Sequence, residues 1–117
     1  MPYVDGYVLP VPKKKLKTYT GMARIGKKMW MKHGALDYKE CVGEDLEAKW
    51  GVGFSRLMKL KPGETVVFAY VVFKSRAHRD RVNARVMKEM EGAGMPPDMP
   101  FDMKRMTYGG FTQIVGA

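Results

Sequence analysis

An uninterrupted run of apolar side chains lies at Thr65–Phe73, with the sequence TVVFAYVVF. Because β-branched and aromatic residues dominate this run, it predicts a strand. The preceding Lys61–Glu64, with proline second and glycine third, predicts a type II turn. Their content of β-branched and aromatic residues predicts three further strands, at Tyr3–Val11, Ala35–Val42 and Arg105–Val115.

Two segments between these strands show helical periodicity instead. In Lys13–His33, apolar or small residues recur at alternating steps of three and four, as on one face of a helix, at Leu16, Tyr19, Ala23, Gly26 and Trp30. A second helix is predicted at Arg76–Glu91, with Ser75 placed to cap its start. Its apolar stripe consists of Val82, Val86 and Met90.

Glycines interrupt the first predicted helix and follow its end. Gly21 and Gly26 each cost about 1 kcal/mol relative to alanine inside a helix, so they either allow close packing on a sheet or permit a bend. Gly34 stands where a left-handed residue ends many helices. Gly43–Gly53 is expected to be a loop, and Phe54–Leu60 fits either a short helix or a strand.

The predicted order is strand–helix–strand followed by strand–helix–strand. This is the order of a ferredoxin-like βαββαβ fold of the α+β class, with a four-stranded antiparallel sheet and both helices on one face. The chain has 117 residues, and domains commonly run to about 100–150 residues. We therefore expect residues 1–117 to form a single domain.

The apolar run at Thr65–Phe73 has a consequence for the whole molecule. Two helices cover one face of a sheet, and a strand with one wet face alternates apolar and polar residues. This strand does not alternate, so apolar side chains also point to the uncovered face, namely Val66, Phe68, Tyr70 and Val72. An exposed apolar patch usually marks an interface. We expect a second copy to cover it in a symmetric homodimer; the alternative is an aromatic sheet that binds another partner.

The composition gives the net charge of the chain and indicates the cellular compartment in which it works. The chain carries 21 Lys and Arg against 12 Asp and Glu, a net charge of +9. Its one cysteine, Cys41, excludes an intramolecular disulfide and favours a reducing cytoplasm; on a strand it is expected to be a small buried hydrophobe. The chain shows no signal peptide and no apolar stretch of the about 20 residues that span a membrane. Its two histidines and one cysteine are scattered, so no metal and no cofactor is expected.

Lysines crowd the start of the first predicted helix, at Lys13, Lys14, Lys15 and Lys17. Between Lys13 and Lys32 lie 8 of the 21 basic residues and no acidic one. Ammonium groups beside free backbone N–H groups are suited to an anion, and they give nucleic acids a salt-sensitive affinity that is blind to base sequence. The plainer interpretation is a solvated basic run.

The third strand also resembles the first signature of RNA-recognition motifs. Residues 66–73 match five of the seven specified positions of that signature. Phe68 and Tyr70 would then stack on bases. Val66 and Val67 stand where the signature has a cation and a glycine, and a dimer formed through this face would leave no platform for RNA.

A pocket for a small molecule is expected between the sheet and the helices. The aromatic residues that the predicted fold brings to this space are Tyr7, Trp30, Tyr38 and Tyr108. Trp and Tyr combine a large apolar body with a polar tip that orients a ligand. Arg105 is the predicted polar anchor of this pocket.

Several segments together resemble the YbaA-like family of short bacterial proteins. The matching segments are YVDGYVLPVPKKKL, HGALDYKECV, KLKPGETVVFAYVVFKSRAHRDRVNARVM and MPFDMKRMTYGGF. The family is one of unknown function in the dimeric α+β barrel superfamily, so the resemblance implies a ferredoxin-like protomer in a dimeric barrel and no particular reaction. Superfamily relatives include cofactor-free monooxygenases and small isomerases, but their catalytic residues do not map onto this chain. Met103 replaces a glycine of the family pattern, and residues 88–99 are shortened relative to that pattern. What the resemblance implies therefore transfers least to the loop before the last strand.

These observations leave three hypotheses. The first is a cytoplasmic dimeric α+β barrel protein that holds a small apolar or anionic molecule between sheet and helices. The second is a basic protein that associates with RNA or another nucleic acid through Lys13–Lys17. The third is a structural dimer without a ligand. No motif in the sequence specifies catalytic residues or a reaction.

Overall fold

The computed structural model describes residues 1–94 and 99–116. Its strands are β1 (Tyr3–Pro12), β2 (Asp37–Val42), β3 (Glu64–Phe73) and β4 (Thr107–Thr112). The α-helices of the described residues are α1 (Leu16–Lys32), α2 (Phe54–Leu57) and α3 (Arg76–Ala93). Two short 3-10 helices, η1 (Lys13–Lys15) and η2 (Met103–Arg105), precede α1 and β4.

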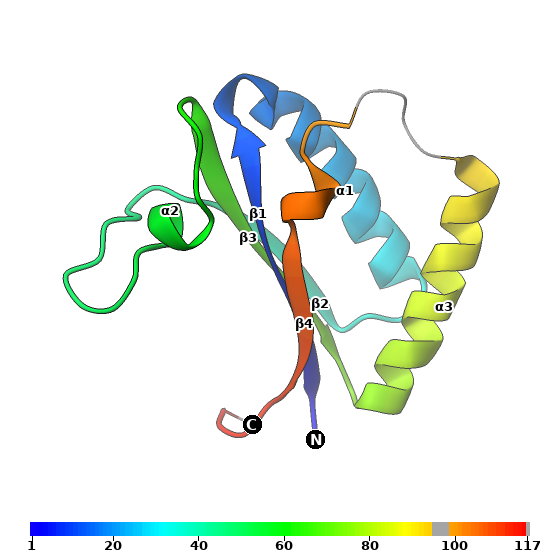
Figure 1. Ribbon diagram of the computed structural model, residues 1–117. Helices are drawn as coiled ribbons and strands as arrows, with labels where there is room; N and C mark the ends of the chain where they lie inside the picture. The colour runs from blue at the N-terminus through cyan, green and yellow to red at the C-terminus, as the bar shows by residue number, and fades with distance from the viewer. Residues whose placement is uncertain (95–98, 117) are drawn as a thin grey trace.

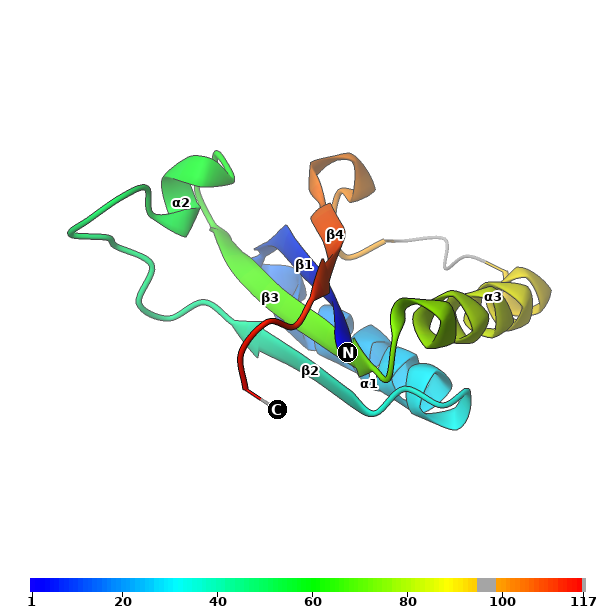
Figure 2. The same ribbon diagram turned by 90° about the horizontal axis from the view of Figure 1, so that it is seen from below.

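The four strands form one antiparallel sheet in the order β2-β3-β1-β4. β1 pairs with β3 along its whole length, from Tyr3 opposite Phe73 to Pro12 opposite Glu64. Helices α1 and α3 lie on one face of this sheet, and α2 lies at its far end, away from both (Figures 1 and 2). This α+β arrangement is consistent with the predicted ferredoxin-like pattern.

The core lies between the sheet and helices α1 and α3. The side chains of β3 that point to the helices are almost completely buried, and Val82 and Val86 of α3 have no exposed surface. Two clusters of buried residues form this core, the first of Ala35, Val71, Phe73, Val82 and Val86 and the second of Leu9, Val11, Tyr19 and Val67.

Local signals in the sequence account for several element ends. Gly63 has φ +83° and the Glu64 N–H donates to the Lys61 carbonyl at 3.1 Å, as the predicted type II turn requires. The Ser75 hydroxyl accepts from the His78 N–H at 3.2 Å and caps α3. Gly34, with φ +112°, follows the end of α1.

Other element boundaries differ from the prediction. The last strand was expected at Arg105–Val115, but β4 covers only Thr107–Thr112. Its end lies opposite Tyr3, the first residue of β1, and Met103–Arg105 form η2 before its start. The ambiguous segment contains the helix α2, and Lys13–Lys15 form a 3-10 turn rather than the first turn of α1.

The loop before β4 was expected at Gly92–Met103. Part of it, residues 95–98, lies outside the described residues. Met103 begins η2 and avoids the left-handed backbone region, which among the described non-glycine residues only Lys59 occupies. Methionine at this position therefore causes no backbone strain. None of the helices in the described part of the chain is long and apolar enough to cross a membrane.

Candidate functional site

Two tyrosines form an aromatic floor on the helix-covered face of the sheet. Tyr7 of β1 lies opposite Tyr108 of β4, and their rings stack at 5.8 Å between centroids with 17° between planes. Tyr108 remains 69% exposed although it points to the helix side. Neither hydroxyl has a hydrogen-bond partner among the described residues. Burial raises the pKa of Tyr7 to about 12, so this hydroxyl is a neutral donor at neutral pH.

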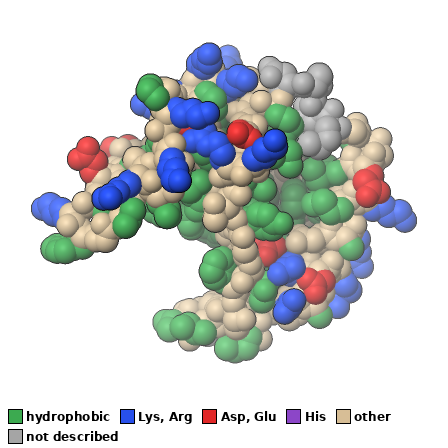
Figure 3. Space-filling view, in the orientation of Figure 1, with side chains coloured by type: hydrophobic (Ala, Val, Ile, Leu, Met, Phe, Trp, Pro, Cys, Tyr) green, Lys and Arg blue, Asp and Glu red, His purple; other side chains and the backbone are tan. Residues whose placement is uncertain are grey.

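Helix α3 supplies a wall beside this floor. Asn83, Met87 and Met90 follow each other at steps of four and three, so they share one face of the helix. Asn83 bonds to β1, which shows that this face is turned toward the sheet. Met87 and Met90 nevertheless stay partly exposed. Figure 3 shows the surface hollowed between β4 and α3, with hydrophobic side chains gathered in the hollow, which we call the β4–α3 cleft.

A chain of polar side chains closes one end of the β4–α3 cleft. The Asn83 amide donates to Asp5 Oδ2 at 3.2 Å and accepts from Trp30 Nε1 at 3.0 Å. Arg79 Nε lies 3.3 Å from Asp5 Oδ1, and another guanidinium nitrogen donates to the Tyr3 hydroxyl at 3.1 Å. Asp5 is 5% exposed, and burial raises the pKa of its carboxyl, opposed by the hydrogen bond from Asn83 and the charge of Arg79.

Glycine 110 of β4 makes room for this polar chain. A side chain at Gly110 would collide with the Tyr3 hydroxyl and the Arg79 guanidinium. Arg79 also lies over the Tyr3 ring, 4.9 Å from its centroid, where a cation is attracted to the ring. The sequence alone did not point to Asp5, Arg79 and Asn83. The one available signal was an acidic residue in the middle of an otherwise apolar strand.

A second polar cluster lies between α1 and β2. The Glu40 carboxylate accepts from the Tyr38 hydroxyl at 2.5 Å and from the Tyr19 hydroxyl. Burial first, and then these bonds to Glu40, raise the pKa of both tyrosines, so they remain protonated donors. Gly26 permits the arrangement, because a Cβ there would lie 2.9 Å from the Tyr38 hydroxyl oxygen. Trp30 packs on Tyr38 with 5.9 Å between ring centroids, and so adjoins both polar clusters.

The five predicted pocket residues do not come together in one place: four form two ring pairs on the helix side of the sheet, and Arg105 has other contacts. Trp30 and Tyr38 meet at α1, and Tyr7 and Tyr108 stack on the sheet. Arg105 donates to both carboxylate oxygens of Glu64, at 2.6 and 2.9 Å, and to the Lys59 carbonyl at 3.0 Å. This guanidinium holds the pKa of Glu64 below its ordinary value and ties η2 to the start of β3.

The predicted lysine cluster lies at the beginning of α1. Lys13, Lys14 and Lys15 form η1, and Lys17 lies in the first turn of α1. Lys13, Lys14 and Lys17 are exposed, and Lys15 is half-buried. No side chain caps η1 or α1.

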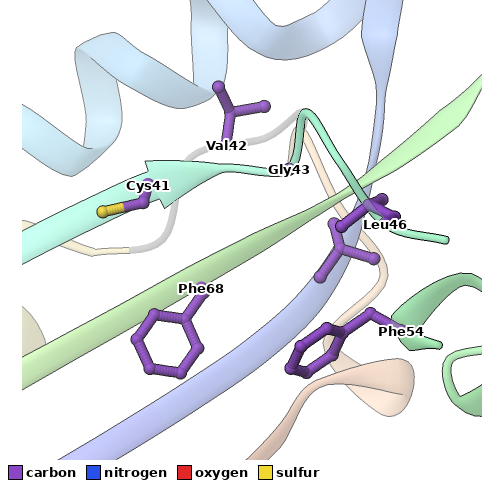
Figure 4. Close-up of a pocket in the computed structure, with 7 residues that line it drawn as sticks. Cys41, Val42, Gly43, Leu46, Phe54 and Phe68 are labelled. Carbon is purple, nitrogen blue, oxygen red and sulfur yellow. The ribbon is translucent and has the colours of Figure 1, made fainter. Parts of the chain in front are cut away.

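The opposite face of the sheet is partly covered. Phe68 is 45% exposed, and Tyr70 and Val72 are half-buried, whereas Val66 retains only 2% of its surface. Val66 therefore does not belong to the open part of this face. In Figure 4, Leu46 and Phe54, from the segment between β2 and β3, approach Phe68 around a small hollow. Val66 also lines this hollow.

Two other side chains complete this face. The prediction that Cys41 is buried is wrong, because the residue is exposed beside Phe68. β2 is an edge strand, so Cys41 has a neighbouring strand on one side only and stays open to solvent on the other. Phe111 of β4 lies over Gly6, where the missing side chain leaves room for the ring, and is 62% exposed.

Known proteins resemble the chain over most of its length. The family model described as "Protein of unknown function (DUF1428)" matches residues 2–103. The "Uncharacterized protein YbaA" of Escherichia coli (strain K12) is 36% identical over 115 residues, which cover 98% of each chain. The protein of the same name from Shigella flexneri has the same identity and coverage. A solved structure, the "De novo designed protein Foldit4", aligns with a TM-score of 0.48 at 10% identity over 97% of this chain and 99% of its own.

Proposed function

Given that the chain belongs to the DUF1428 family together with YbaA, we propose that it is a homodimer whose protomers each hold a small, largely apolar molecule in the β4–α3 cleft. The observation that carries the proposal is the stacked Tyr7–Tyr108 pair. Its hydroxyls have no partner among the described residues, and Tyr108 stays open to solvent on the face that the helices otherwise cover.

The chemistry of the β4–α3 cleft favours an uncharged ligand. Its walls are aromatic rings and methionines, which adapt to an apolar body. Arg79 is paired with Asp5 and Arg105 with Glu64, so neither arginine offers an unpaired charge to an anion. The Tyr7 hydroxyl is suited to donate to one acceptor atom of the ligand, such as a hydroxyl or carbonyl oxygen.

The second copy is proposed to cover the open face of the sheet. Phe68, Tyr70 and Phe111 leave apolar surface there, and such patches usually mark interfaces. The charges of Asp37 and Lys39, which share this face, neutralise each other at 2.6 Å. Two identical copies therefore meet without like-charge repulsion. The sheets of two protomers joined in this way form a dimeric α+β barrel, and the exposed thiol of Cys41 suits a reducing cytoplasm.

Calorimetric titration with naphthol and with naphthoate tests the proposed ligand class. We expect naphthol to bind with a Kd below about 1 mM, and naphthoate, which carries a negative charge on the same body, to bind at least about tenfold more weakly.

Replacing Tyr108 with alanine should raise the Kd of naphthol at least about tenfold, because the ligand loses its stacking surface. Ile25→Ala is the control, since it removes an exposed apolar side chain of α1 that belongs neither to the β4–α3 cleft nor to the open face of the sheet. Equal losses in the two variants, or no binding of naphthol, would contradict the proposal.

A further inference from the structure

Most of the net charge of the protein gathers at one end of its sheet. Three of its chain segments, residues 13–17, 56–64 and 102–105, carry nine basic and two acidic side chains, a net charge of +7. The loop 43–53 at the same end carries Lys49 against Glu44, Asp45 and Glu47, so this end as a whole carries +5 of the net +9. The basic residues of the three segments, which we call the lysine end, are Lys13, Lys14, Lys15, Lys17, Arg56, Lys59, Lys61, Lys104 and Arg105.

Hydrogen bonds join the three segments of the lysine end. The Lys13 N–H donates to the Gly63 carbonyl at 2.8 Å, which fastens η1 to the turn before β3. Arg105 joins η2 to the same turn through Glu64 and the Lys59 carbonyl. Figure 3 shows blue side chains gathered over this end of the molecule. The cluster is a product of the fold, because its segments are separated by about 40 residues each in the sequence.

Glu64 and Asp102, the acidic residues of these three segments, do not balance the exposed lysines Lys13, Lys14, Lys17, Lys61 and Lys104. Glu64 already accepts two hydrogen bonds from Arg105. Asp102 accepts from the Lys104 backbone N–H at 3.0 Å and so caps η2. Like charges held together in this way repel each other, and a polyanion that replaces their counterions relieves the repulsion.

We propose that the lysine end binds the phosphate backbone of a double-stranded nucleic acid without reading its base sequence. Lysines are ammonium point charges on flexible stems, which suit an array of phosphates better than one planar anion. The three segments contain no aromatic residue, whereas the bases of a single strand stack on aromatic side chains. Two exposed rings nearby in sequence, Trp50 and Phe54, belong to the loop 43–53 and to α2. Exposed large apolar side chains are limited in the three segments to Leu57 and Met103 among the described residues, fewer than a helix that inserts into a membrane surface presents.

This site is independent of the proposed small-molecule ligand. The lysine end lies at the end of the sheet, and its residues are not those of the β4–α3 cleft. The nucleic-acid alternative from the sequence rested on Lys13–Lys17 alone, and the structure adds the turn before β3 and η2 to that cluster. The expected binding does not involve Phe68 and Tyr70, whose face is assigned to the second copy.

Fluorescence anisotropy with a labelled DNA duplex of about two helical turns tests this inference on the full chain. We expect a Kd near or below about 1 µM at about 50 mM salt, and a steep loss of affinity at about 200 mM salt. A triple variant with Lys14→Glu, Lys61→Glu and Lys104→Glu changes one exposed residue in each segment. It should bind at least about a hundredfold more weakly and with a smaller salt dependence, because each phosphate that the protein no longer neutralises reduces the log–log slope by about 0.9.

The matched control is a triple variant on the exposed surface of α3, with Arg81→Glu, Arg85→Glu and Lys88→Glu. It makes the same change in net charge and should weaken binding by less than about tenfold, because only long-range attraction is lost. Equal losses in the two triple variants, no binding by the wild type, or binding that salt does not weaken would overturn the proposal. So would binding to phosphatidylglycerol vesicles at a salt concentration where the duplex stays free.

Circular dichroism melting of both triple variants shows whether each variant is folded. If the lysine-end variant is unfolded, the single variants Lys14→Gln, Lys61→Gln and Lys104→Gln replace it. Each is expected to lower the salt slope by about 0.9, and three unchanged slopes would overturn the proposal.

Discussion

Gly26 shapes the polar cluster under α1 through the side chain that it lacks. The Tyr38 hydroxyl passes close to its Cα on the way to Glu40. The sequence left two explanations for the glycines in this helix, and the structure separates them. Gly26 allows close packing on the sheet, whereas Gly21 faces open space.

Substituting each glycine by alanine should therefore give different results. Both changes add the same intrinsic helix stability of about 1 kcal/mol, so their difference isolates the contact with Tyr38. We expect Gly21→Ala to raise the free energy of unfolding, and Gly26→Ala to lie about 1–3 kcal/mol below Gly21→Ala because the tyrosine must shift. Urea denaturation followed by circular dichroism measures both values, and equal gains would contradict the account.

The Glu64–Arg105 pair predicts a pH dependence of stability. Arg105 lowers the pKa of Glu64 below its ordinary 4.5, so the folded state binds this proton less readily than the unfolded state. The pair therefore stabilises the fold above about pH 4.5, and this stabilisation is lost as the pH falls through the lowered pKa.

In Glu64→Gln, the loss of stability that results from protonating Glu64 at low pH should be absent. We expect the variant to be less stable by about 1–3 kcal/mol at about pH 6, and its deficit to shrink toward about pH 3. Urea midpoints at the two pH values provide the measurement. Glu91→Gln, an exposed change at the end of α3, should retain the wild-type dependence. A deficit that stays constant with pH would refute the role of Glu64.

Partners that are far apart in the sequence explain which candidate site residues the sequence analysis missed or misplaced. Tyr7, Trp30, Tyr38 and Tyr108 were grouped by their places in the expected fold, and the structure places all four on the helix side of the sheet as two ring pairs. Arg105 was predicted to anchor the pocket, but it binds Glu64 instead. The sequence did not reveal this partner because the two residues are 41 positions apart. Asn83 and Asp5, 78 positions apart, showed their connection only when α3 was placed on the sheet.

At the scale of elements, α3 is held on the sheet by few interactions besides Val82 and Val86. Asn83 bonds both to Asp5 of β1 and to Trp30 of α1, and Lys32 of α1 pairs with Glu89 at 2.7 Å. Asn83 is thus a polar joint between three elements, and Arg79 adds a second polar link from α3 to Asp5 and Tyr3 of β1.

Replacing Asn83 with alanine should loosen α3. It leaves the buried carboxylate of Asp5 and the indole N–H of Trp30 without this partner, at an expected cost of about 2–4 kcal/mol. Hydrogen exchange should show α3 amides exchanging faster while those of β1 and β3 stay protected. Arg85→Ala, an exposed change on the same helix, serves as the control. Unchanged exchange in Asn83→Ala would show that the other contacts of α3 hold the helix without Asn83.

The ends of elements were predictable where a local signal sets them. Ser75 and Gly63 marked the start of α3 and the turn before β3, since capping and left-handed backbone depend on the residue itself. The end of β4 depends on its partner instead. Thr112 lies opposite Tyr3 at the start of β1, so the later residues Ile114 and Val115 have no strand to pair with, although their composition favours one.

At the scale of the molecule, 117 residues do not cover both faces of this sheet. Helices α1 and α3 cover one face, and the segment around α2 covers the other only near Val66. This covering segment was not foreseen, because Gly43–Gly53 was expected to be a loop and Phe54–Leu60 fitted either a short helix or a strand. The open remainder around Phe68 and Phe111 is what we propose a second copy to cover.

Multi-angle light scattering at micromolar concentration tests this claim most directly. We predict a mass of twice the 13.3 kDa of one chain for the wild type. The variant Phe68→Lys should have the single-chain mass, because two lysines buried at a symmetric contact repel each other. Ile25→Lys, on the exposed surface of α1, should keep the doubled mass. A wild type with the mass of one chain, or a Phe68→Lys variant that remains dimeric, would contradict the account.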